Sequence, residues 1–87
     1  MLFIKLDTME NVSSLTKLNE KYKKENDIVV DVSHGRYIID GCSLLAVISL
    51  LGNIVKVIPI TDDNVLLESF KNDLEKIGGF DSEEVVM

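Results

Sequence analysis

The chain has 87 residues, of which 15 are acidic and 9 are basic, and its formal net charge at pH 7 is −6. This length fits one small domain, and the 46% of hydrophobic residues is enough for an ordinary core. The acidic charge argues against nucleic-acid binding, because proteins that bind phosphate backbones usually carry a basic excess. The longest apolar region, between Leu44 and Ile60, is interrupted by Gly52, Lys56 and Pro59, so we expect no membrane span.

The chain has few residues of the types that commonly act in catalysis or metal binding. One cysteine, Cys42, excludes an internal disulfide, and Cys42 with one histidine, His34, makes no metal-ligand set. There is no nucleophile–base–acid combination and no Gly-rich phosphate loop, so we expect no enzyme activity and no cofactor. The brief apolar run at the start is broken by Lys5 and Asp7 and is not a secretory signal, so we expect a cytoplasmic protein.

The first half of the chain predicts a strand, a helix and a hairpin. Apolar residues alternate over 2–7, as in a strand with one buried face, and recur at helical spacing from Val12 to Tyr22. Strands over 28–33 and 37–40 flank a turn in which Gly35 can adopt a positive φ. Several polar residues could cap the helix, and the sequence does not choose among them: Thr8, Glu10, Asn11, Ser13 and Ser14.

The second half predicts a short helix, a strand and a longer helix. The short helix covers 43–51, and the strand over 54–58 is apolar at almost every position and ends at Pro59, which cannot donate a ladder hydrogen bond. The segment Thr61-Asp62-Asp63-Asn64, with two acids at the positive end of the dipole, begins the last helix, and Gly78 and Gly79 end it. The expected buried stripe of that helix is Leu67, Phe70, Leu74 and Ile77.

This order of elements predicts an α+β open-faced sandwich, a four-stranded antiparallel sheet with three helices on one face in the order βαββαβα. We divide the chain into a domain over 1–79 and an acidic C-terminal tail over 80–87. A ferredoxin-like βαββαβ arrangement, and with it a small-molecule sensor, is the competing interpretation. That arrangement requires the first and third strands to be adjacent and central in the sheet.

The segment from Gly35 to Leu50, with Asp40-Gly-Cys-Ser-Leu leading into an apolar helix, resembles HPr, the histidine-containing phosphocarrier family of the bacterial sugar phosphotransferase system. The resemblance covers about residues 2–77 and implies an HPr-like sandwich. It places Ser43 at the regulatory serine that an ATP-dependent kinase phosphorylates in Gram-positive members. The family signature Gly-(Leu)-His-x-Arg-Pro is missing, since Met9-Glu-Asn-Val-Ser-Ser14 has no His, Arg, Pro or Gly and Glu10 lies near the position of the histidine.

A phosphohistidine needs an imidazole at a helix N-terminus and an arginine to hold the phosphate. A glutamate at that position repels phosphate, so the resemblance implies a regulatory or protein-binding domain that has lost phosphohistidine transfer. Ser43 is then a helix cap, a phosphosite or both. The implied partner is a protein, such as a regulator or a phosphotransferase-system component, and the chain is a monomer or weak homodimer. Candidate contact residues at the starts of the first two helices are Val12, Leu44 and Val47. A phosphocarrier that uses an atypical residue is the remaining alternative.

Overall fold

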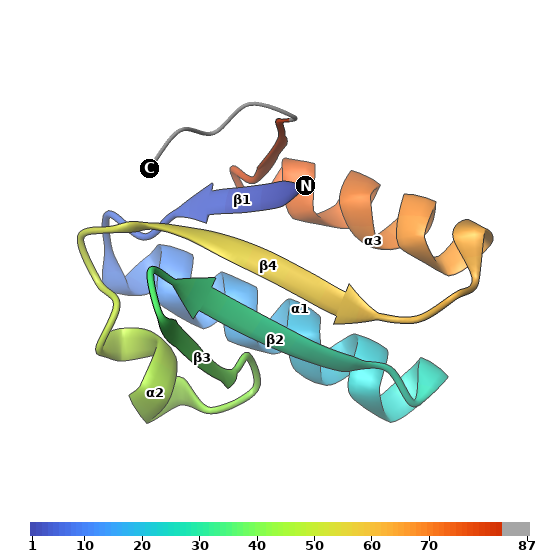
Figure 1. Ribbon diagram of the computed structural model, residues 1–87, viewed down its shortest axis with the longest axis horizontal. Helices are drawn as coiled ribbons and strands as arrows, with labels where there is room; N and C mark the ends of the chain where they lie inside the picture. The colour runs from blue at the N-terminus through green and yellow to red at the C-terminus, as the bar shows by residue number, and fades with distance from the viewer. Residues whose placement is uncertain (83–87) are drawn as a thin grey trace.

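A computed structural model describes residues 1–82, and its five strands form one antiparallel sheet in the order β3-β2-β4-β1-β5 (Figure 1). The α+β class and the three helices are as expected, but the sheet has five strands rather than four. The strands are β1 (Leu2–Lys5), β2 (Val29–His34), β3 (Tyr37–Asp40), β4 (Ile54–Ile60) and β5 (Phe80–Asp81). The helices are α1 (Met9–Asn26), α2 (Leu44–Ile48) and α3 (Asn64–Lys76).

The fifth strand comes from the first two residues of the segment expected to be a tail. Phe80 pairs with Phe3 of β1, and their rings stack with centroids 5.8 Å apart. Asp81 forms ion pairs with the Met1 amino group at 3.0 Å and with Lys71 of α3 at 3.4 Å. These contacts join β5 to β1 on one side and to the middle of α3 on the other. The rest of the expected tail, 83–87, lies outside the described residues, and the division after residue 79 stays a prediction.

The Asp81 contacts predict a dependence of stability on acid. The hydrogen bond from the Met1 amino group, followed by that from Lys71, lowers the pKa of Asp81 below its ordinary value. A lowered folded-state pKa means that the stabilisation is present above the ordinary aspartate pKa and is lost as pH falls through the folded-state value. We expect Asp81→Asn to lower the melting temperature slightly near neutral pH and to match the unmodified protein in strong acid.

Thermal unfolding followed by circular dichroism, from about pH 7 to about pH 2, checks this expectation. Asp62→Asn is the control, because Asp62 is exposed and forms no salt bridge among the described residues. A difference between Asp81→Asn and the unmodified protein that persists unchanged in acid would contradict the assignment.

The strand order separates the two architectures that the sequence left open. β1 lies between β4 and β5, and β3 lies at the edge beyond β2. The first and third strands are therefore not adjacent within the described residues. The ferredoxin-like arrangement that a small-molecule sensor would need is not the one observed.

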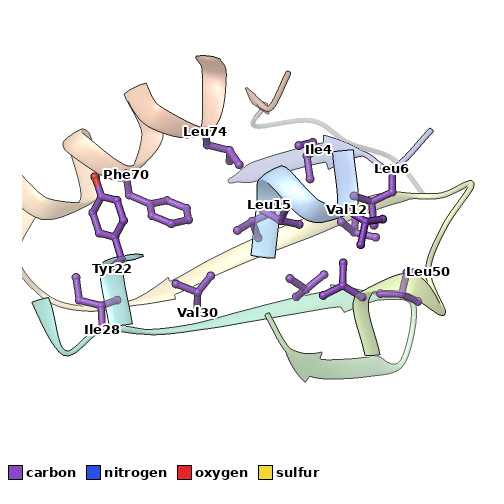
Figure 2. Packing of buried hydrophobic residues seen from close by; sticks show 14 residues of the cluster. Ile4, Leu6, Val12, Leu15, Tyr22, Ile28, Val30, Leu50, Phe70 and Leu74 are labelled. Atoms are coloured by element: carbon purple, nitrogen blue, oxygen red, sulfur yellow. The ribbon is translucent and has the colours of Figure 1, made fainter. Parts of the chain in front are cut away.

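Side chains from all three helices pack against one face of the sheet (Figure 2). The alternating residues of β1, β2 and β4 point toward them, and Phe70 of α3 meets Tyr22 of α1 edge-to-face at 5.0 Å. The Tyr22 hydroxyl lies 2.7 Å from Ser69 Oγ and donates to Asp73 at 2.8 Å, so its polar end is satisfied. The buried cluster is Ile4, Leu6, Val12, Leu15, Tyr22, Ile28, Val30, Val32, Val47, Leu50, Val55, Val57, Phe70 and Leu74.

Strand β4 continues through Pro59, where the sequence predicted its end. Pro59 is opposite Val30 of β2, but β1 pairs with β4 only as far as Leu2 and Val57. Residues of β4 hydrogen-bond alternately to β2 and to β1, and the backbone nitrogen of Pro59 is one of those that point away from β2. It points toward the β1 side of the sheet, where β1 does not extend as far as Pro59. The missing N–H therefore breaks no ladder bond, and the strand extends to Ile60.

The turn after β3 is held against α1 by a buried contact. Asn19 is fully buried, and its Nδ2 donates to the Gly41 carbonyl at 2.9 Å. The Gly41 N–H donates to the Val30 carbonyl at 2.9 Å, so both backbone polar groups of Gly41 are hydrogen-bonded. The segment that leads into α2 is thereby fixed relative to α1 and β2.

Candidate functional site

Ser43, the expected phosphosite, is the N-cap of α2. Its Oγ accepts a hydrogen bond from the Ala46 N–H at 3.3 Å, and its carbonyl accepts from the Val47 N–H at 3.0 Å. The preceding turn is tied by Asp40, whose carbonyl accepts from the Ser43 N–H at 3.2 Å and whose Oδ1 accepts from the Cys42 N–H at 2.9 Å. The capping role is observed directly, and the Ser43 side chain is only partly buried.

The apolar residues of α2 divide into a buried and an exposed set. Val47 is fully buried, whereas Leu44 is 47% and Leu45 81% exposed. Leu51, just beyond the helix, is 40% exposed. Leu44 and Leu45, which directly follow Ser43, and Leu51, beyond the other end of α2, therefore present apolar side chains to solvent. Such residues are candidates for a protein contact surface. We call Leu44, Leu45 and Leu51 the α2 leucine patch.

Two of the expected contact residues are wrong as surface residues. Val12 and Val47 both have an exposed fraction of 0% and belong to the core cluster. Val12 is on the inward side of α1 and Val47 is on the inward side of α2, and the inward side of an amphipathic helix carries its most apolar residues. Leu44 remains exposed, and Leu45, which sequence reasoning passed over, is more exposed than any other residue of the patch.

A shallow groove of about 490 Å³ lies beside the turn that precedes Ser43. Its lining combines Cys42 with residues from the end of α1, namely Glu20, Lys23, Lys24 and Asp27. Burial, followed by the charge of Asp40, raises the pKa of the Cys42 thiol, whereas Lys23 lowers it. The thiol is therefore mainly protonated at neutral pH and is a poor nucleophile.

The resemblance to HPr predicts the family's phosphorylated histidine near the start of α1. In the structure this position is occupied by a helix cap. Thr8 is the N-cap, and it forms a capping box with Asn11: Thr8 Oγ1 accepts from the Asn11 N–H at 3.3 Å and the Thr8 N–H donates to Asn11 Oδ1 at 3.1 Å. Glu10 is exposed in the first turn, as suits an acid at the positive end of a helix dipole. The cap that the sequence left open is thus Thr8.

His34 ends β2 at the same end of the sheet at which β1 ends (Figure 1). Its neighbour Ser33 is opposite Lys56, and Lys56 is opposite Phe3. His34 is therefore about 10 Å, two strand spacings, from β1, with β4 between them. The turn that follows is a two-residue hairpin in which Gly35 has φ 60°, as a type II′ turn requires.

The described residues contain no group of three or more His, Cys, Asp or Glu side chains that could hold a metal ion. None of the helices in residues 1–82 is both long and apolar enough to cross a membrane. Comparison of the chain with protein-family models, with curated proteins and with solved structures found no match.

Proposed function

We propose that the chain is an HPr-like, non-catalytic protein-binding domain that contacts its partner through the α2 leucine patch and is switched by phosphorylation of Ser43. The observation that carries the proposal is the 81% exposure of Leu45 two residues after Ser43. An apolar side chain of that exposure loses water-accessible area when a partner covers it, which favours association. The partner is a protein with an apolar recess, in the class of regulators or phosphotransferase-system components.

The surroundings of Ser43 explain how a phosphate could act as the switch. A phosphoserine carries a charge of about −1.5 to −2 at neutral pH and keeps acceptor oxygens for the Ala46 N–H. The same charge, next to Leu44 and Leu45, must be dehydrated when an apolar partner docks, so phosphorylation weakens that docking. Asp40, which accepts from the Cys42 N–H, adds repulsion, and Lys23, which lines a groove together with Cys42, offsets part of it.

The first experiment is intact mass measurement with site mapping after two separate incubations. One uses ATP with an HPr serine kinase, and the other uses phosphoenolpyruvate with enzyme I. We expect a gain of one phosphate on Ser43 with ATP alone, and no gain in Ser43→Ala. Ser49→Ala is the matched control, because Ser49 is the exposed serine at the other end of α2.

Other outcomes of the same measurement contradict parts of the proposal. Labelling by phosphoenolpyruvate that disappears in His34→Ala would instead support the alternative of a phosphocarrier with an atypical residue. No label in either incubation would contradict the phosphorylation switch but not the binding role.

Capture of partners by Leu45→Lys tests the binding role, with Val65→Lys as control because Val65 is 77% exposed on α3. Equal capture by the two variants would place the contact elsewhere.

A further inference from the structure

Strand β3 forms one edge of the sheet and lacks the usual protection of an edge. Proteins commonly block such edges with lysine, proline or a very short strand. β3 reads Tyr37-Ile38-Ile39-Asp40, and Tyr37 and Ile38 are 71% and 68% exposed. The opposite edge, β5, has only two residues. An edge strand whose first three residues carry no charge can pair with another strand.

The hairpin fixes which backbone groups of β3 face outward. In a two-residue hairpin the flanking residues, here His34 and Tyr37, form a hydrogen-bonded pair, and such pairs then alternate along the ladder. The hydrogen bond from the Gly41 N–H to the Val30 carbonyl has the same phase. Tyr37 and Ile39 therefore bond to β2, whereas the N–H groups of Ile38 and Asp40 and the Ile38 carbonyl point away from the sheet.

A second copy of β3 fits this edge in one register. A two-fold axis through Ile38, perpendicular to the sheet, pairs Ile38 with the same residue of the other copy through two backbone hydrogen bonds. Tyr37 then lies opposite Ile39 of the other copy, so an exposed aromatic ring covers an apolar side chain. Arg36 lies opposite Asp40 of the other copy, and the Asp40 N–H meets the Arg36 carbonyl.

The charges of this hairpin are complementary to themselves. Asp31 and Asp40 are directly opposite each other across β2 and β3, an arrangement of like charges that destabilises a sheet. Neither carboxylate forms a salt bridge among the described residues, and Arg36, exposed in the turn, forms none there either. In the two-fold register Arg36 of each copy lies opposite Asp40 of the other, so Asp40, whose Oδ1 already accepts from the Cys42 N–H, gains an ion pair and Arg36 gains a carboxylate partner.

We propose that two copies of the chain associate through antiparallel pairing of their β3 strands about Ile38, which makes one continuous sheet across the dimer. The contact is small, so the dimer is weak and forms at high protein concentration. Its surface is separate from the α2 leucine patch in sequence, and its test does not depend on phosphorylation or on any partner.

Charge exchange between the copies is the first test. Arg36→Asp and Asp40→Arg each place like charges across the two-fold axis, and we expect each variant alone to dimerise about tenfold more weakly in sedimentation velocity. Mixed together, the two variants restore both opposite-charge pairs, so native mass spectrometry is expected to show the heterodimer in excess of either homodimer. Circular dichroism of each variant checks that the fold is intact.

Backbone pairing has its own signature in amide hydrogen exchange. We expect the amides of Ile38 and Asp40 to become protected as protein concentration rises, whereas the amide of Ile39, bonded to β2, is protected at every concentration.

Ile38→Lys is expected to abolish the dimer, and Ile60→Lys, at a 54% exposed position of β4, is expected to keep it. A protein that stays monomeric at every concentration overturns the proposal. A dimer that survives Ile38→Lys, or a mixture with no heterodimer excess, also overturns it.

Discussion

Gly41→Ala is expected to lower the free energy of unfolding by about 3 kcal/mol. A methyl group at Gly41 would lie 2.6 Å from Asn19 Nδ2 and 2.6 Å from the Val30 carbonyl oxygen. The Val30 oxygen is backbone and cannot move alone, and Asn19 is fully buried, so the turn must shift away from α1. That shift breaks the hydrogen bond from Asn19 to the Gly41 carbonyl and the one from the Gly41 N–H. Urea denaturation followed by circular dichroism measures the loss.

A double-mutant cycle with Asn19→Ala separates the two obstacles. In the Asn19→Ala background one of the close contacts is gone, so Gly41→Ala should cost less than it does in the unmodified protein. The remaining cost reports the clash with the Val30 carbonyl. A cost for Gly41→Ala below about 0.5 kcal/mol in the unmodified background would show that the turn has room for a side chain.

Phe70→Ala is expected to destabilise the chain by about 4 kcal/mol. Phe70 is fully buried between α3 and the sheet, and its ring meets Tyr22 edge-to-face, so its removal leaves a cavity between α1 and α3. An 87-residue domain has a total stability of roughly 4–13 kcal/mol. The substitution therefore removes a large share of that stability. We expect Phe70→Ala, where it still folds at room temperature, to unfold at a much lower urea concentration than the unmodified protein.

Val65→Ala provides the matched comparison on the same helix. Val65 is 77% exposed, so its truncation should change the free energy of unfolding by less than about 0.5 kcal/mol. Similar losses for Phe70→Ala and Val65→Ala would mean that α3 is not docked on the core as described. The contribution of the Tyr22 hydrogen bonds can be measured separately in Tyr22→Phe, which removes the hydroxyl and keeps the ring that contacts Phe70.

Local patterns were sufficient for most elements of the fold. The Gly35 hairpin was predicted because two-residue turns have a strong local signal, and α1 was predicted from its apolar spacing. Long-range pairing was not visible in the sequence. β5 depends on the contact of Phe80 with Phe3, some seventy-seven positions apart, and the continuation of β4 through Pro59 depends on where β1 stops. In α3 the partly buried residue on the core is Leu66 rather than Leu67, a difference of one position on the helix surface.

The candidate site was predicted less completely than the fold. Ser43 was placed correctly as the cap of α2, because small polar residues before an apolar run are typical caps. Val47 was wrong as a contact residue, since in a five-residue helix the sequence does not tell which side faces the core. Val12 was wrong because it belongs to the apolar stripe of α1, which packs on the sheet. The exposure of Leu45 follows from the burial of Val47, because Leu45 lies two positions from Val47 and so on another side of the helix. The structure was needed to show which of these sides faces the core.

The position of β1 in the sheet also has a consequence for synthesis on the ribosome. β1 leaves the ribosome before the other described strands, yet both of its neighbours, β4 and β5, come later in the chain than β2 and β3. The apolar segment from Leu2 to Leu6 therefore stays unpaired while about fifty further residues are translated, several seconds at ordinary elongation rates. During that interval its exposed apolar side chains and unpaired backbone groups can bind chaperones. The hairpin of β2 and β3, whose contacts are local, can form well before β1 pairs with β4 and β5.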